Sequence, residues 1–273
     1  MTHAVIKHRV TFVKKINLIR NQKLEKQGIT LTYRKDDPQS IQKMFGSIAK
    51  KYDRTNAILS FQMHRYWNSQ LIHRVTDAHN PESLLDLCCG TGEIAFTYLK
   101  KSKLPKKIYM LDFCEEMLEC ARQKSQASNF NNHQISYIQA NAEVIPLKAE
   151  SVQSATVAYG IRNIKEPKNC INEVFRVLKP GGTFGILELT RPTNRFLQLG
   201  HHAYLNMVLP IMGRLLTSNK QAYEYLCNSI HSFVKPEEVE ALLKESGFIQ
   251  TSQKKLAGGI ATIIYGKKPH NIK

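Results

Sequence analysis

A short glycine-containing stretch constrains the fold of this chain more than any other feature. The residues Cys89-Gly90-Thr91-Gly92-Glu93 follow the apolar run Leu84-Leu85-Asp86-Leu87, which is typical of a buried strand, and they precede a helical pattern. Gly90 and Gly92 permit a tight turn and a close approach of a ligand to the backbone, because they carry no Cβ atom. A strand, a glycine turn and a helix in this order are typical of the ligand-binding edge of an open α/β sheet.

Two acidic residues narrow the choice of ligand. Asp112 ends a second apolar segment, about 20 residues after the glycines, where a carboxylate can accept hydrogen bonds from ribose hydroxyls. NAD and S-adenosylmethionine both fit this arrangement, and Gly90-x-Gly92-x-x-Ala95 satisfies the permissive dinucleotide pattern. Asp86 favours S-adenosylmethionine, because a carboxylate so close to the turn repels a pyrophosphate but tolerates a sulfonium and an amino group. We therefore predict S-adenosylmethionine as the cofactor, bound near Asp86, Gly90, Gly92 and Asp112.

The rest of the chain alternates between strand and helix patterns. Strands are expected at 83–88, 107–112, 135–140, 152–158, 183–189, 248–255 and 259–266, and helices at 92–101, 115–125, 167–178 and from Pro236 to Gly247. Two further helices are expected before the first strand, one starting at Pro38 and one covering 56–75. This alternation predicts an α/β fold with a doubly wound, mostly parallel seven-stranded sheet of the Rossmann-like type.

The length of 273 residues, 42% of them hydrophobic, is sufficient for one large domain with additions. Residues 38–273 are predicted to form this domain, with a helical lid at 38–78. A cap insertion is expected at about 195–230, where the alternation is interrupted. His, Asn, Pro and Arg residues within 196–216 argue against a membrane span, so this segment is expected to cover a ligand with its apolar face or to add a core helix.

The net charge of +17 favours an anionic partner, either a nucleic acid or an acidic membrane surface. Residues 1–35 contain nine Lys and Arg residues against one acid, Glu25. We expect 1–37 to be a basic, flexible N-terminal extension, with an amphipathic helix at a membrane as the alternative. No secretory signal is expected, and the six cysteines lack the spacing of disulfide frameworks or metal ligands, which favours the reducing cytoplasm and no metal.

Three sequence blocks occur in the order found in a known family. They read Tyr52-Asp53-x-x-Asn56-x-x-Leu59-Ser60-x-x-x-His64-x-x-Trp67, Tyr159-Gly160-Ile161-Arg162-Asn163, and Arg176-Val177-Leu178-Lys179-Pro180-Gly181-Gly182 followed by Glu188. From about residue 44 to 268 the chain resembles the class I S-adenosylmethionine methyltransferases of quinone biosynthesis, which act on ubiquinone and menaquinone precursors. Thr55 and Thr190 depart from the usual Met and Ser of these blocks.

This resemblance implies the class I methyltransferase fold and methyl transfer to a ring carbon of a prenylated quinol. It also implies that Thr91 in the glycine turn and Asp112 at the ribose bind the cofactor, and that Asn141 and Ala142 face the adenine. Asn141 could instead cap its own loop. Ala158 replaces a family serine, so the cofactor contact of that hydroxyl does not carry over to this chain.

Details within the resemblance favour the menaquinone branch. The turn Cys88-Cys89-Gly90-Thr91 is found in that branch, and Met207 and Ile264 stand where some relatives have His. The expected reaction is therefore methylation of demethylmenaquinol to menaquinol. Methylation of a ubiquinone precursor, 2-polyprenyl-6-methoxy-1,4-benzoquinol, or of both quinols remains the alternative, and an unrelated small-molecule methyltransferase is a further one.

The chemistry of carbon methylation suggests roles for four residues. A ring carbon becomes nucleophilic when the adjacent hydroxyl loses its proton, so the enzyme must stabilise an oxyanion. Arg162 and Asn163, expected just beyond the fourth strand, are our candidates for that task, because an arginine stays cationic and can stabilise the anion. Tyr52 and His64 are candidates to position or relay the proton. An ordinary salt bridge is the alternative role for Arg162, and packing in the lid is the alternative for the other two.

The positive charge also raises the alternative of a nucleic-acid methyltransferase. Segment 159–165 contains neither the nucleophilic Cys of C5-pyrimidine enzymes nor the Asn/Asp-Pro-Pro-aromatic clamp of amino-group methylases, so no nucleic acid is expected as a partner. A nucleic-acid or membrane binding protein that merely retains the fold is the alternative from a different class. Because a prenylated quinol resides in the bilayer, peripheral contact with an anionic membrane is expected through the basic N-terminus and the cap.

Overall fold

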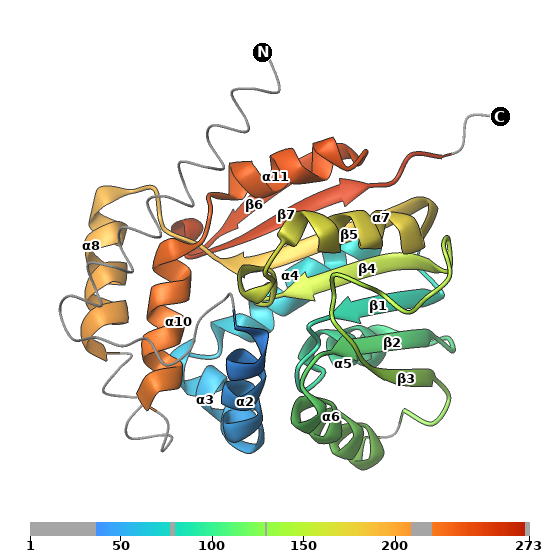
Figure 1. The fold of residues 1–273 in the computed structure, drawn as a ribbon, viewed down its shortest axis with the longest axis horizontal. Helices are drawn as coiled ribbons and strands as arrows, with labels where there is room; N and C mark the ends of the chain where they lie inside the picture. Colours follow the sequence, from blue (N-terminus) through green and yellow to red (C-terminus); the bar gives the residue numbers. More distant parts are fainter. Residues whose placement is uncertain (1–36, 77–79, 129, 209–219, 271–273) are drawn as a thin grey trace.

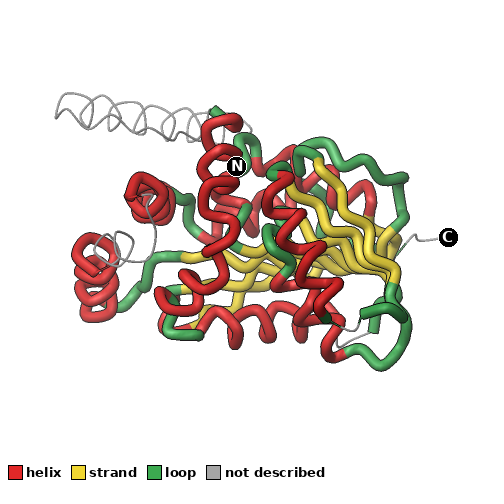
Figure 2. Tube along the Cα trace, turned by 90° about the horizontal axis from the view of Figure 1, so that it is seen from below, coloured by secondary structure: helices red, strands yellow, loops and turns green. Residues whose placement is uncertain are grey.

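The computed structural model of the chain describes residues 37–76, 80–128, 130–208 and 220–270. The expected basic extension therefore lies outside the described residues, except for Asp37, and so does the middle of the expected cap. The described part forms a twisted sheet with helices on both of its faces, and further helices lie beyond one end of the sheet (Figure 1, Figure 2).

The sheet has seven strands in the order β3-β2-β1-β4-β5-β7-β6. Their bounds are β1 Ser83–Leu87, β2 Lys107–Asp112, β3 Gln134–Gln139, β4 Val152–Ala158, β5 Leu178–Leu189, β6 Ile249–Leu256 and β7 Ala261–Lys267. The first five strands are parallel, whereas β7 runs antiparallel to both β5 and β6. The predicted doubly wound, mostly parallel seven-stranded sheet is thus confirmed.

Two layers of helices bury the two faces of the sheet. Helices α7 (Pro167–Val177) and α11 (Pro236–Glu245) pack on one face, and α4 (Met63–Thr76), α5 (Glu93–Lys101) and α6 (Glu115–Ala127) pack on the other. Strand β1 is buried along its whole length, and its successive leucines, Leu84 and Leu85, contribute to opposite layers. The core therefore holds the carboxyl ends of the parallel strands in a fixed frame.

The N-terminal helices differ from the expectation. Helix α2 (Pro38–Ile48) begins at a proline after the N-cap residue Asp37, as the sequence predicts, and a short 3₁₀ helix η1 (Ala49–Lys51) joins it to α3 (Tyr52–Leu59). The expected single helix over 56–75 is wrong, because the chain breaks between α3 and α4. Phe61 and Gln62 adopt left-handed backbone angles there, with φ values of 48° and 65°. The break lets α4 pack on the sheet while α3 turns toward the ligand-binding edge.

The cap begins with α8 (Arg195–Ala203), continues in a π-helical segment (Tyr204–Val208) and ends with α10 (Lys220–Ser232). Figure 1 shows α8 and α10 at one end of the molecule, beside α2 and α3. Most predicted strand bounds agree with the structure to within two residues, but the start of β5 differs by more. Strand β5 starts at Leu178 rather than at 183, because Leu178 pairs with Val152 on β4.

Candidate active site

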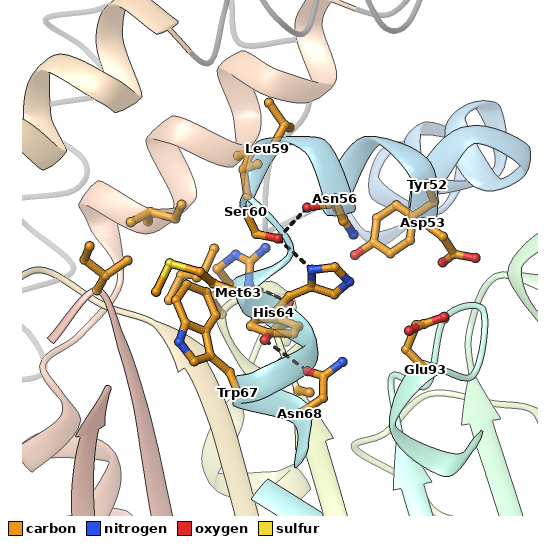
Figure 3. Close-up of a pocket in the computed structure, with 18 of the residues that line it drawn as sticks. Tyr52, Asp53, Asn56, Leu59, Ser60, Met63, His64, Trp67, Asn68 and Glu93 are labelled. Carbon is orange, nitrogen blue, oxygen red and sulfur yellow. Dashed lines mark hydrogen bonds between the residues drawn. The ribbon is translucent and has the colours of Figure 1, made fainter. Parts of the chain in front are cut away.

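A cavity of about 480 Å³ opens at the carboxyl ends of the parallel strands. Its wall includes residues of helices α2, α3 and α4, the glycine turn after β1, the segment after β4, and the cap. The residues that bear on its chemistry are Tyr52, Asp53, His64, Asp86, Gly90, Thr91, Arg162, His201 and Tyr225. Figure 3 shows Tyr52, Asn56 and His64 from the helices facing Glu93 of the turn region across this space.

The two glycines of the turn have different functions. Both have positive φ angles, 52° for Gly90 and 88° for Gly92, which favour glycine over other residues. A Cβ atom on Gly92 would lie 2.5 Å from Phe96 and 2.6 Å from Met110, so packing also demands glycine there. A Cβ atom on Gly90 would meet nothing within 4 Å. Gly90 therefore presents an open stretch of backbone to the cavity, as required for a ligand that lies against the turn.

The two predicted acids, Asp86 and Asp112, both accept backbone hydrogen bonds at or next to this turn. Asp112 accepts hydrogen bonds from the backbone N–H groups of Gly90 (2.8 Å) and Cys114 (3.0 Å). Asp86 accepts from the N–H of Ala95 (3.2 Å) and from the hydroxyl of Thr156 (2.9 Å). Asp86 lines the cavity, whereas Asp112 does not.

Burial makes the charged forms of both acids unfavourable. Desolvation raises the pKa of Asp86 to about 7 and that of Asp112 to about 6, although hydrogen bonds to each carboxylate act in the opposite direction. The pKa of each folded-state carboxyl is thus well above that of an exposed aspartate. Protonation of these groups therefore favours the folded protein between about pH 4 and pH 7.

This shift leads to a testable pH dependence. As the pH rises through this window, Asp86 ionises in the unfolded chain before it does so in the folded protein, so the free energy of unfolding of the ligand-free protein should fall. Asp86→Asn should show a shallower fall and should be the more stable protein at pH 8. The asparagine can still accept from Ala95, and the Thr156 hydroxyl can turn to accept from its amide. Urea unfolding at pH 5 and pH 8 measures the free energy of unfolding of both proteins. An equal fall in this free energy between the two pH values for the wild type and Asp86→Asn would contradict the prediction.

Asn141 and Ala142 follow β3 at the same edge of the sheet, but neither lines the cavity. Ala142 is buried in the core between the sheet and α7, and Asn141 is exposed. The side-chain oxygen of Asn141 accepts from the N–H of Glu143 at 2.9 Å, which is the loop-capping contact considered as the alternative. A contact between these residues and the adenine therefore stays a prediction.

Thr91 connects the turn to the helices above it. Its hydroxyl donates a hydrogen bond to Asp53 on α3, and Asp53 also forms an ion pair with Lys124 on α6. The ammonium group of Lys124 in turn donates to the carbonyl of Thr91 at 3.1 Å. Sequence reasoning assigned no role to Asp53, although its place beside Tyr52 in the first block was a usable signal.

Tyr52 and His64 both lie at the cavity, as the sequence-based hypothesis requires. Burial lowers the pKa of His64, so its imidazole is neutral at physiological pH, and its Nδ1 atom lies 2.6 Å from the hydroxyl of Ser60. Burial also raises the pKa of Tyr52, which keeps the phenol protonated, although the Arg162 charge opposes this shift. His64 can thus accept a proton and Tyr52 can donate a hydrogen bond.

Arg162 lies at the cavity in a short 3₁₀ helix, η2 (Ile161–Asn163), directly after β4. Its Nη1 atom donates at 2.5 Å both to Glu188, which is completely buried on β5, and to the carbonyl of Tyr159. Arg162 therefore forms the salt bridge considered as its ordinary role. None of the described residues accepts from its Nη2 group, which leaves that end of the guanidinium for a ligand oxygen.

Glu188 and Asn163 complete this part of the site. Glu188 belongs to the third sequence block, but sequence reasoning gave it no role. Burial raises the pKa of Glu188, while the nearby Arg162 charge lowers it. Asn163 does not line the cavity, and its side-chain oxygen accepts a hydrogen bond from the Tyr225 hydroxyl at 2.9 Å. Its expected action on a substrate oxygen stays a prediction.

The fold is that of the class I S-adenosylmethionine-dependent methyltransferases. A SAM-dependent methyltransferase of Thermotoga maritima aligns with a TM-score of 0.56 at 18% identity, covering 82% of this chain and 98% of that one. A protein of Methanococcus maripaludis described as an S-adenosyl-L-methionine-dependent methyltransferase aligns with a TM-score of 0.57 at 21% identity, covering 82% and 93%. The open backbone at Gly90 between buried carboxylates fits such a cofactor, and S-adenosylmethionine is the methyl donor of this class.

The chain belongs to the ubiE/COQ5 methyltransferase family, whose sequence model matches residues 33–268. The demethylmenaquinone methyltransferase of Protochlamydia amoebophila is 52% identical over 238 residues, which cover 87% of this chain and 98% of the relative. The protein of the same name from Chlamydia caviae is 40% identical over 224 residues, which cover 82% of this chain and 94% of the relative. These matches confirm the predicted family and enzyme class.

Within the described ranges, no helix is both long and apolar enough to cross a bilayer. Those ranges also contain no cluster of three or more His, Cys, Asp or Glu side chains that could hold a metal ion.

Proposed function

We propose that this enzyme transfers a methyl group from S-adenosylmethionine to a ring carbon of demethylmenaquinol, which gives menaquinol. The observation that carries the proposal is the 52% identity to a demethylmenaquinone methyltransferase over 98% of that protein's length. The cavity supports it as well, since its lining combines polar groups of the turn with apolar cap residues such as Leu197 and Leu205. Such a cavity suits a polar ring that carries an apolar tail.

The residues around Gly90 are suited to hold the cofactor. The open backbone at Gly90, the hydroxyl of Thr91 and the carboxylates of Asp86 and Asp112 are the groups that we assign to its binding. The bound cofactor supplies an electrophilic methyl group. The remaining work of the protein is to hold the quinol ring beside it, accept a hydroxyl proton and stabilise the resulting oxyanion.

We assign the oxyanion to Arg162, because its guanidinium is fixed by Glu188 and keeps Nη2 without an acceptor among the described residues. His64 is the candidate proton acceptor, since burial keeps its imidazole neutral and Ser60 orients the ring. Tyr52 lines the same cavity and is suited to donate a hydrogen bond to the quinol. Transfer of the quinol hydroxyl proton to His64 would make the adjacent ring carbon nucleophilic toward the methyl group that the cofactor supplies. The S–CH3 bond would break as the new C–C bond forms, S-adenosylhomocysteine would leave, and the hydrogen on the methylated carbon would be lost as a proton to restore the aromatic ring.

The test is methyl transfer from S-adenosylmethionine to chemically reduced demethylmenaquinol in detergent, followed by mass spectrometry. A demethylated ubiquinol precursor is assayed in parallel. We expect methylation of the naphthoquinol alone. Methylation of both would indicate a shared enzyme of the two branches, and cofactor binding without methylation of either would refute the substrate assignment.

We further propose that the enzyme works at the surface of an anionic membrane. Several large apolar side chains next to the cavity are exposed, among them Phe61 (75%), Phe196 (84%) and Leu199 (70%). The first lies at the break between α3 and α4, and its ring is 6.4 Å from that of Tyr204 on the cap, so the two elements form one rim. Arg195, beside Phe196, is exposed as well. Apolar and basic side chains together suit an interface of anionic lipids.

The rim can be tested separately from catalysis. Phe196→Asp with Leu199→Asp should lower the partition of the enzyme onto vesicles of mixed neutral and anionic phospholipid by about tenfold or more, because each apolar side chain loses roughly 1.5–3 kcal/mol of burial. Leu104→Asp is the matched control, since that side chain is also exposed but precedes β2 at the opposite edge of the sheet. Flotation of the vesicles measures the bound fraction. An unchanged fraction for the double variant would exclude the rim as the contact.

A further inference from the structure

One helix of the cap contacts two neighbouring residues after β4, Arg162 and Asn163. Tyr225 and Ser229 lie on α10, four residues apart, so they stand one turn above the other on the same face of the helix. The Tyr225 hydroxyl donates to the side-chain oxygen of Asn163 at 2.9 Å. The Nε atom of Arg162 donates to the Ser229 hydroxyl at 3.3 Å. Two successive loop residues are thus held by two successive turns of one helix.

The directions of these hydrogen bonds are mutually consistent. The Ser229 hydroxyl donates its own proton to the carbonyl of Leu226 at 2.9 Å, so its oxygen is free to accept from Arg162. The Tyr225 hydroxyl, by contrast, gives its proton to Asn163. Both side chains and Arg162 are buried, which makes an unpaired group at any of these positions costly. The contact between α10 and the loop is therefore specific rather than an incidental surface contact.

Tyr225 also borders the space where substrate must lie. Its ring lines the cavity together with other residues of α10, including Leu226 and Ile230. The only other side-chain anchor described for the Arg162 guanidinium is Glu188 on β5, which holds it from the sheet side. Arg162 is thus fixed from two directions, by the rigid sheet and by a helix that forms part of the substrate wall.

We propose that Tyr225 and Ser229 are positioning residues, through which α10 sets the orientation of Arg162 and Asn163 for methyl transfer. The proposal rests on the proposed function, because it concerns the site that acts on the quinol. It adds that the cap does more than cover the apolar part of the substrate. The helix that contacts the substrate also holds the group that stabilises the oxyanion, so cap placement and oxyanion stabilisation are coupled.

The test uses Tyr225→Phe and Ser229→Ala in the full-length enzyme. Each should lower kcat by about tenfold, equivalent to about 1.4 kcal/mol, and should leave the KM for S-adenosylmethionine within about twofold, because neither residue touches the glycine turn. Ser229→Thr keeps the hydroxyl and should restore most of kcat. Tyr98→Phe is the matched control, since that buried tyrosine donates to the carbonyl of Pro81 at the other edge of the sheet. Its kcat should stay that of the wild type.

Hydrogen exchange supplies a readout that does not depend on turnover. The amides of 160–164 should exchange faster in Tyr225→Phe and Ser229→Ala than in the wild type and in Tyr98→Phe, because the loop loses one anchor in each. Unchanged kcat and unchanged exchange would overturn the proposal. A raised KM for the quinol with normal kcat would also overturn it, since Tyr225 would then only bind substrate. If the wild type methylates neither quinol, the proposed function fails, while the exchange measurement still decides whether α10 holds the loop.

Discussion

Arg162→Met is expected to lower kcat by about 10²- to 10³-fold, the usual cost of removing a fixed donor from a developing oxyanion. Methionine has a similar length and is tolerated in apolar surroundings, but it offers no hydrogen bond. The remaining Glu188 can take up a proton, because burial already raises its pKa. Initial rates with reduced demethylmenaquinol in detergent measure the loss. The KM for S-adenosylmethionine should change little, since the hydrogen bonds of Arg162 go to Glu188, Tyr159 and Ser229 and not to the glycine turn.

A double variant separates chemistry from stability. In Arg162→Met with Glu188→Met, both partners of the buried pair are replaced by apolar side chains, an exchange that is often neutral or stabilising in proteins. We expect the double variant to regain the stability lost in the single variants but to keep the low kcat. A double variant with near-normal turnover would show that Arg162 has only the structural role of a salt-bridge partner.

Glu188→Ala is expected to destabilise the protein by about 3–5 kcal/mol, the range found when one partner of a buried ion pair is removed. Glu188 is completely buried, and its carboxylate accepts from the guanidinium of Arg162 and from the backbone N–H groups of Arg162 and Leu189. Its loss leaves a cation buried without a counter-charge. Urea unfolding followed by circular dichroism measures the change at neutral pH.

An exposed ion pair provides the control for this measurement. Glu245 pairs with Lys168 at 2.9 Å on the surface between α11 and α7. Glu245→Ala should cost no more than about 1 kcal/mol, as is usual for such pairs. The loss of stability for Glu188→Gln should lie between those for Glu188→Ala and Glu245→Ala, because the amide keeps one acceptor but no charge. A loss for Glu188→Ala as small as that for Glu245→Ala would mean that solvent reaches Arg162 and that the pair is not buried in solution.

The sequence was most informative where a single pattern decides the structure. The bounds of β2 and β4 match the predicted ones, because each is a continuous run of residues suited to a buried strand. The break at Phe61 and Gln62 could not be predicted in this way, since 56–75 contains neither Gly nor Pro and is locally compatible with one helix. After the break, α4 packs on the sheet through Leu71, Ile72 and Val75, so the placement of this helix depends on residues far along the chain.

The site shows the same division. The position of Asp112 at the end of a strand predicts its place beside the turn, and the structure puts its carboxylate on the N–H of Gly90. The ion-pair partner of Arg162 is Glu188, which is 26 residues further along the chain on β5. No periodicity in the sequence relates these two residues. Contacts of this kind follow from the order of the strands in the sheet. The three hydrogen bonds or ion pairs that matter most at Arg162, Asn163 and Thr91 all join separate elements of secondary structure.

The contact of Asp53 with Thr91 and Lys124 has a consequence for protein engineering. Helix α3 looks like an exchangeable module, because it precedes the sheet in the chain and carries its own sequence block. Yet the carboxylate of Asp53 contacts Thr91 in the glycine turn and Lys124 on α6, which both belong to the part of the chain that contains the sheet. A chimera that takes α2–α4 from one relative and the sheet from another would therefore need to keep Asp53, Thr91 and Lys124 as a matched set. Recombination boundaries are better placed outside these three residues than between them.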